Sequence, residues 1–360
     1  MALTTARTGL TPQQWDDKFF EAYIRENRFN RYMGTDENAI IQLKDDLTKK
    51  AGDSVTFALV NELTGSGVTG NTTLEGNEEA LDTRSFRCYV EPLRHAVAVT
   101  DWDEQKSAID LRDAGKSMLK MWAMSKMRDD IITALGSING TAYASADATA
   151  RNAWMVDNAD RVLVGKLKSN YNATHATALA NVDNTDDKLT PEAVSLMKRI
   201  AQSSSPKIRP IRLNDDEEWF VLFANKLAFR DFSINSTVTQ ANRDARERGV
   251  LTNPIFKGGA LVWDGVIVRE IPEIAVLTGA GAGGIDIAPV YLCGAQALGI
   301  GWAQRTKTTT DARDYSFVHG VAIGEVRGVK KMIFGSGAGD TDDLKDHGVV
   351  TGFFAAVADA

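Results

Sequence analysis

The sequence predicts an α+β fold, and three observations support this. Segments with strand-like alternation and segments with helical periodicity follow one another without a regular βα order, which is typical of α+β proteins. Residues 101–135 carry the longest unbroken helical pattern in the chain. Residues 64–83, which separate two strand segments, contain few large apolar side chains. The chain is therefore expected to combine packed strands with a long helix and an extended hairpin.

A short aromatic segment precedes the strands. Thr11, Pro12 and Gln14 supply a capping threonine, a proline in the first helical turn and the glutamine of a capping box. The predicted helix runs to Met33. This much apolar surface could cover a neighbouring chain or dock on its own subunit, and the sequence leaves both interpretations open. The apolar side chains of the segment are Trp15, Phe19, Phe20, Tyr23, Ile24, Phe29 and Tyr32.

Two predicted strands, residues 55–63 and 84–99, frame the polar hairpin. Both are rich in strand-forming residues, and the second alternates apolar with polar side chains. An isolated ribbon of two strands is marginal in water, so the hairpin is expected to protrude and rest on another chain. Its candidate contact residues are Val68, Leu74 and Leu81.

Residues 101–135 are expected to form one continuous helix. Asp101 and Glu104 have the spacing of a capping box, and Gly136 lies where a helix would end. At about 1.5 Å per residue the helix would span roughly 50 Å, enough to cross a subunit. Its apolar face is wide enough to contact more than one partner, although an ordinary core helix is favoured over a cofactor-binding one. That face comprises Ala108, Leu111, Ala114, Met118, Met121, Trp122, Met124, Met127, Ile131 and Leu135.

The second half of the chain mixes strands with helices. Thr190, Pro191 and Glu192 start a helix that ends near Ser203. The other predicted elements are a strand at 161–164, strands at 207–213 and 219–232, a charged helical turn at 242–249, and further strands with one small-residue helix within 261–271, 291–302, 317–334 and 349–357.

Composition excludes several classes of protein. The chain has 360 residues and a formal charge of -7, from 41 Lys plus Arg and 48 Asp plus Glu, which argues against a protein that mainly grips phosphate backbones. No segment is apolar enough for a membrane span or a signal peptide. Cys88 and Cys293 are isolated, so free thiols in a reducing compartment are expected, and the scattered histidines give no zinc signature.

No motif predicts catalysis, a cofactor or a metal. The G-x-G-x-x-G matches at residues 65–70 and 279–284 lack the helix that would follow them in a dinucleotide-binding site. Gly115-Lys116-Ser117 lies inside the predicted long helix rather than in a phosphate-binding loop. The acidic run 340–346 is interpreted as a solvated turn, with calcium binding as the less favoured alternative. The chain is therefore expected to be a non-enzymatic protein whose exposed elements serve assembly.

The stretch from Thr11 to Leu81 closely resembles the beginning of the major capsid proteins of phage N4 type. The similarity continues through residues 93–97 and the helix DEQKSAIDLRDAGKSMLKMWAMSKMRDDII. After Gly136 only fragments match, in residues 253–256, 263–266, 317–334 and 348–354.

This resemblance implies an HK97-like capsid fold built from segments with distinct roles. The N-terminal arm would comprise residues 1–52, the E-loop 53–100, and the peripheral domain 101–189 with its spine helix at 101–135. The axial domain would comprise 190–305, and 306–360 would return to the peripheral sheet and end in a C-terminal strand.

The resemblance also implies what the chain does. It would self-assemble into hexamers and pentamers of an icosahedral head shell that encloses double-stranded DNA without sequence-specific binding. Assembly would take place in the host bacterial cytoplasm, with a portal, a separate scaffolding protein because only a short arm precedes the E-loop, and the option of a decoration protein. An encapsulin-like cellular container and a nucleotide-binding enzyme are the alternatives. No cofactor is expected, and no lysine and asparagine pair points to self-crosslinking.

Overall fold

The computed structural model describes residues 28–45, 47, 52–60, 63, 65–71, 73–81, 83–107, 110–214, 217–246, 260–337 and 339–357. The chain forms two compact units. Unit 1 contains residues 1–55, 88–135 and 298–330, and unit 2 contains 56–87, 136–297 and 331–360. Each unit is therefore assembled from three separate stretches of the chain. The mixture of helices and strands confirms the α+β prediction.

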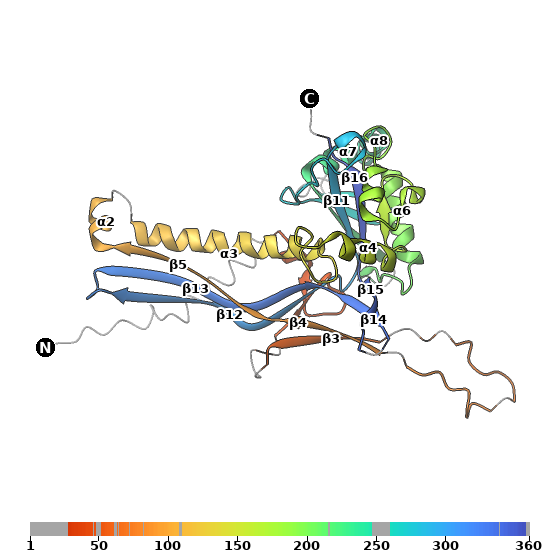
Figure 1. Ribbon diagram of the computed structural model, residues 1–360, viewed down its shortest axis with the longest axis horizontal. Coiled ribbons are helices and arrows are strands. Elements are labelled where there is room, and N and C mark those ends of the chain that lie inside the picture. The colour runs from red at the N-terminus through yellow and green to blue at the C-terminus, as the bar shows by residue number, and fades with distance from the viewer. Residues whose placement is uncertain are drawn as a thin grey trace. The chain divides into compact units, whose positions relative to one another are not determined.

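Unit 1 is a five-stranded sheet with a long helix along it (Figure 1). Within the sheet, β13 pairs antiparallel with β5, and β12 pairs parallel with β2. Gly115 allows the helix to approach the sheet closely, because a Cβ there would lie 3.2 Å from Cγ1 of Val97. In sheet order the strands are β1 (Met33–Gly34), β2 (Ile41–Lys44), β12 (Leu298–Arg313), β13 (Val318–Lys331) and β5 (Glu91–Thr100).

The prediction of one continuous helix over 101–135 is wrong. The structure has α2 (Asp101–Lys106) and then α3 (Leu111–Leu135), with Ser107 in an extended conformation between them. The side chain of Asp110 explains the restart, because its Oδ1 accepts hydrogen bonds of 3.0 Å from the backbone N–H groups of Arg112 and Asp113. Thr100, rather than Asp101, caps α2 by accepting from the backbone N–H of Asp103.

The apolar stripe of α3 is narrower than the sequence suggested. Its buried members are Leu119, Ala123, Met127, Ile131, Ala134 and Leu135. Arg327 on β13 is itself buried, and it pairs with Asp130 on α3 at 2.7 Å and with Glu325 at 2.6 Å. This buried ion pair ties the helix to the sheet.

Unit 2 is organised by a seven-stranded sheet that helices cover (Figure 1). Its central strands are β16 (Val349–Ala355) and β11 (Ile287–Cys293), which are buried along their whole length. The remaining strands are β6 (Val162–Val164), β7 (Ile211–Asn214), β8 (Glu217–Ala224), β9 (Ala260–Trp263) and β10 (Val266–Glu270), and the helices are α4 (Ala148–Asp157), α5 (His175–Ala180), α6 (Pro191–Ser203), α7 (Lys226–Ile234) and α8 (Ser236–Arg246).

The strands of unit 2 come from distant parts of the chain. β16 lies between β6 and β11, so it pairs with the sheet that contains most of the 190–305 segment rather than with the strands of unit 1. Residues 136–189 belong to the same unit. Hydrogen bonds across the sheet join these distant segments of the chain. No local sequence pattern predicts such pairing.

Three local predictions in unit 2 are also wrong. Residues 219–232 are not one strand, because β8 ends at Ala224 and Asn225 caps α7 by accepting from the backbone N–H of Ala228 at 2.8 Å. Residues 261–271 are two strands joined at Asp264 and Gly265, both with positive φ, as a tight hairpin requires. The segment 137–188, predicted to be a strand between polar loops, contains α4 and α5 as well. By contrast, α6 begins and ends where predicted, with Thr190 as its cap.

The predicted hairpin is present as β3 (Ser54–Val60) and β4 (Thr83–Tyr89). Along β4 the half-buried Phe86 and the buried Cys88 alternate with the exposed Arg87 and Tyr89, so the predicted alternation is confirmed. Within unit 2 the ring of Phe86 packs edge-on against that of Phe334, with centroids 6.3 Å apart. Phe334 lies on β14 (Ile333–Ser336), which forms a second small ribbon with β15 (Asp342–Asp346).

Candidate assembly surfaces

The loop between β3 and β4 exposes apolar side chains. Leu74 is 63% exposed and Leu81 60% exposed, while Val68 is half-buried. These three residues are the contact candidates from the hairpin, and Val60 and Leu63 are exposed beside them. The described part of the loop contains neither helix nor strand. Its apolar side chains therefore have no core of their own to enter.

The candidates from the aromatic arm divide into two groups. Trp15, Phe19 and Tyr23 lie outside the described residues. Phe29 is described and is 0% exposed, next to a short 3-10 turn at Asn30–Tyr32. Phe29 therefore packs on its own subunit, as one of the two interpretations of the aromatic segment expects, and it offers no surface to a partner.

Unit 1 also exposes large apolar side chains, some of them on the predicted apolar face of the long helix. Met118 and Met121 on α3 are 60% and 54% exposed. Tyr315 is fully exposed in the turn between β12 and β13, where Asp314, Tyr315 and Ser316 all have positive φ. Such a backbone is unfavourable for residues other than glycine, and strain of this kind clusters at functional positions. The only sequence feature that could have indicated this exposed turn is the run Asp314-Tyr315-Ser316 between two segments of alternating apolar and polar residues.

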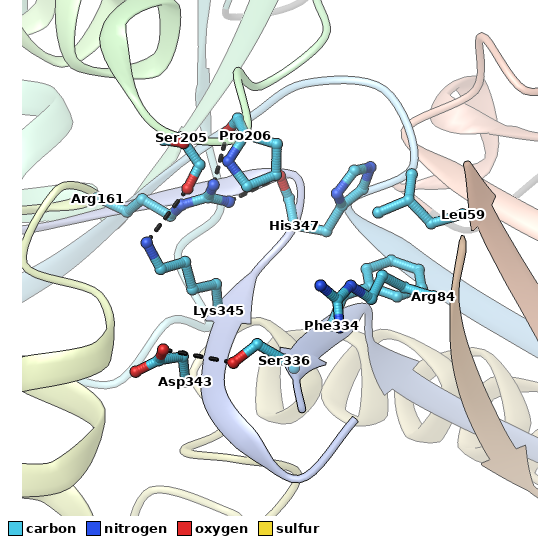
Figure 2. Close-up of a pocket in the computed structure, with 11 residues that line it drawn as sticks. Leu59, Arg84, Arg161, Ser205, Pro206, Phe334, Ser336, Asp343, Lys345 and His347 are labelled. Carbon is cyan, nitrogen blue, oxygen red and sulfur yellow. Dashed lines mark hydrogen bonds between the residues drawn. The ribbon is translucent and has the colours of Figure 1, made fainter. Parts of the chain in front are cut away.

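A cavity of about 210 Å³ lies within unit 2 (Figure 2), and we call it the Arg161 pocket. Figure 2 shows Arg161 and Lys345 on one side, Arg84 and Phe334 on the other, and His347 between them. Six separate stretches of the chain converge on the pocket. Its lining consists of Leu59, Arg84, Arg161, Ser205, Pro206, Phe334, Gly335, Ser336, Asp343, Lys345 and His347.

Backbone carbonyl groups fix the guanidinium group of Arg161. It donates to the carbonyl oxygen of Asp346, to that of His347 at 3.2 Å and to that of Pro206 at 2.6 Å. Its Nε is buried without a hydrogen-bond partner among the described residues. Nδ1 of His347 is in the same condition. Burial, helped by the positive charges of Arg161 and Arg209, lowers the pKa of His347 to about 4, so the ring is neutral at pH 7.

A buried ion pair lies beside the pocket. Lys331 Nζ donates to Asp346 Oδ2 at 2.6 Å, and Trp154 Nε1 donates to the same oxygen at 3.1 Å. The side chains of Lys331 and Asp346 are 1% and 2% exposed. The interpretation of residues 340–346 as a solvated turn is therefore wrong at Asp346, because the run enters β15 and its last carboxylate neutralises a buried lysine.

The described residues offer no site of cofactor or metal type. No three His, Cys, Asp or Glu side chains among them are placed to hold a metal ion. The glycines at 65–70 are followed by loop, and those at 279–284 contain only a three-residue 3-10 turn. Cys88 and Cys293 are free and buried. No described helix is long and apolar enough to span a membrane.

Comparison with known proteins gives a consistent result. The family model described as phage capsid protein matches residues 4–357. The chain is 27% identical to the major capsid protein of Pseudomonas phage KPP25, over 95% of this chain and 94% of the relative.

The structure resembles solved phage capsids. It matches the capsid of cyanophage Pam1 with a TM-score of 0.83 and 38% identity over 100% of both chains. The capsid of Ralstonia phage GP4 matches with a TM-score of 0.73 and 24% identity, over 93% of this chain and 92% of that one. These similarities confirm the expected HK97-like fold.

Proposed function

The chain belongs to the phage capsid protein family, and on this premise we propose that its copies assemble as hexamers and pentamers into an icosahedral head. It is a major capsid protein that forms the head shell of a phage. The family is one of structural proteins rather than enzymes. The matches to phage capsids favour this function over the encapsulin-like container and the nucleotide-binding enzyme.

The exposed loop between β3 and β4 is the observation that carries the proposal. Leu74 and Leu81 expose most of their side chains in the single subunit, and burying apolar surface contributes about 25 cal/mol per Å². The copies all carry the same formal charge of -7, so apolar and shape-specific contacts must outweigh their mutual repulsion. We assign residues 53–100 to an E-loop that a neighbouring copy covers, and residues 101–135 to the spine region.

The resemblance of residues 11–81 to N4-type major capsid proteins supports assigning the chain to that subfamily. On that resemblance we propose that the shell encloses double-stranded DNA without reading its sequence, and that it forms in the host bacterial cytoplasm. A portal and a separate scaffolding protein are the expected partners, and a decoration protein is an optional one. Trp15, Phe19 and Tyr23 are proposed to contact neighbouring copies.

Electron microscopy of purified particles tests the proposal. A variant with Leu74→Ser and Leu81→Ser should fold, with an unchanged far-UV circular dichroism spectrum, yet form few shells. The matched control is Val156→Ser, which removes an exposed apolar side chain from α4 instead and should leave assembly unchanged. Normal shells from the loop variant would contradict the assignment of this loop to intersubunit contact. Particles filled with protein cargo rather than DNA would contradict the phage head itself.

A further inference from the structure

A carboxylate covers part of the free edge of β4. β3 and β4 form a sheet of only two strands, so the outer edge of β4 has no neighbouring strand among the described residues. A two-stranded ribbon is marginal in water, and unpaired N–H groups at its edge leave it open to fraying. At this edge the backbone N–H of Ser85 donates to Oδ2 of Asp340 at 2.9 Å. Asp340 thus takes the place of a strand at the base of the loop between β3 and β4.

Two further interactions join Asp340 to the start of β4. The hydroxyl of Ser85 donates to the same oxygen at 3.1 Å, and Nη1 of Arg84 lies 3.6 Å from Oδ1. Hydrogen bonds to a carboxylate are stronger than those between neutral groups. The backbone N–H of Ser85 is the main reason why the pKa of Asp340 lies below its usual range, so the carboxylate is ionised at pH 7.

The turn between β14 and β15 directs this carboxylate at β4. Asp340 has a φ of 55°, a left-handed conformation that is uncommon for residues other than glycine. The turn also folds back onto β14, since a Cβ on Gly335 would clash with the carbonyl oxygen of Asp340. A backbone of this kind persists where surrounding contacts determine it, and the contacts of Asp340 are with β4.

An apolar contact holds the same strand on the same part of unit 2. Phe86 follows Ser85, and its ring centroid lies 6.3 Å from that of Phe334 on β14 and 6.5 Å from that of Phe57 on β3. The base of the loop is therefore held at one apolar and one polar point. The described part of the loop contains neither helix nor strand, so these contacts at its base decide where the loop begins and ends.

We propose that Asp340 is a positioning residue for the loop between β3 and β4, whose carboxylate covers the edge of β4 and fixes the base of the loop before a neighbouring copy binds it. This inference rests on the proposed shell function. A loop that is already positioned loses less conformational freedom on binding, which raises the affinity between copies. Without the carboxylate only the copies that hold the loop correctly can bind, and the apparent affinity falls in proportion to their fraction.

The variant Asp340→Gly tests the inference, because it removes the carboxylate and keeps a residue that accepts a positive φ. Hydrogen exchange of the full chain, followed by mass spectrometry of peptides covering residues 83–89, should become about tenfold faster at Ser85 through loss of a hydrogen bond to a charged group. The subunit concentration at which shells appear in electron micrographs should rise by up to about tenfold. Ser85→Ala removes only the hydroxyl and should shift both quantities in the same direction by less.

Two control variants separate positioning from general stability. Asp147→Ala removes one negative charge and one hydrogen bond from a backbone N–H, that of Ala150 at 2.7 Å, at the start of α4 in the same unit. It should lower the urea midpoint at least as much as Asp340→Gly does and leave the concentration for shell formation unchanged. Asp340→Asn keeps an oxygen acceptor on a residue that accepts a positive φ, so it should behave like the original chain.

Three outcomes would overturn the inference and leave the proposed function intact. They are unchanged exchange at Ser85 in Asp340→Gly, normal assembly of that variant despite faster exchange, and an equal loss of assembly in Asp147→Ala. The last would show that assembly follows overall stability rather than the position of the loop. Failure of the unmodified chain to form shells at all would instead contradict the proposed function.

Discussion

Replacing Asp346 by alanine should lower the free energy of unfolding by about 3 to 5 kcal/mol. The carboxylate receives two hydrogen bonds, one of them from a charged ammonium group, and their loss accounts for about 2 to 4 kcal/mol. The ammonium group of Lys331, which is 1% exposed, would then be buried without its counter-charge, and its desolvation supplies the remainder.

Urea unfolding of the purified subunit at pH 7, followed by far-UV circular dichroism, measures this cost as a shift in midpoint at constant slope. The control is a double variant, Lys331→Met with Asp346→Leu, which replaces the pair by apolar groups. It should recover most of the loss, because removing both buried charges is far less costly than removing one. A loss below about 1 kcal/mol for Asp346→Ala, or a double variant no more stable than the single one, would refute the reasoning.

Three further predictions concern other buried or capping groups. Burial lowers the pKa of His175 and of His347 from 6.5 to about 4, so between these pH values the unfolded chain binds more protons than the folded one. The free energy of unfolding should therefore fall as the pH drops from 6.5 to 4. Urea midpoints at pH 7 and pH 5 measure this fall, and His347→Gln should make it smaller. Cys88 and Cys293 should resist iodoacetamide until the chain unfolds, since both thiols are buried and burial raises their pKa, that of Cys88 to about 11; labelling of native protein, detected by mass spectrometry, would contradict this. Asp110→Ala should cost about 1 kcal/mol through the lost cap of α3, measured by thermal unfolding, and an unchanged midpoint would exclude a capping role.

The sequence predicted elements well where a local signal acts alone. Thr190 and Pro191 mark the start of α6 because a cap and a first-turn proline leave few alternatives. The hairpin of β3 and β4 followed from alternation and from the polar run between the strands. Both features depend on residues within a few positions of one another.

Predictions failed where a polar residue inside an apolar run decides the conformation. Asp110 interrupts the long helix and Asn225 follows the end of β8. In each case the side chain accepts a hydrogen bond from a backbone N–H group and so starts a new helix. The pair Asp264-Gly265 is typical of a tight hairpin turn, but it lies within a long apolar run and was therefore not predicted as a turn.

The candidate surfaces were predicted only in part. Leu74 and Leu81 were identified because apolar residues in a polar loop have nowhere local to pack. The Arg161 pocket could not be predicted, since Arg84, Arg161, Ser205 and Lys345 are brought together only by the tertiary fold. Phe29 was a contact candidate and is buried in its own chain. The sequence pattern of an aromatic residue in a terminal segment is the same whether the side chain packs into its own core or into a neighbour's.

The position of β16 has a consequence for the order of events during synthesis. Residues 349–355 fill the gap between β6 and β11 and follow every other strand of that sheet in the chain, so the ribosome must have translated β16 before the sheet of unit 2 can close. A nascent chain that has not reached residue 349 thus lacks a finished building block. Premature joining of half-made copies is thereby discouraged by the threading of the chain itself.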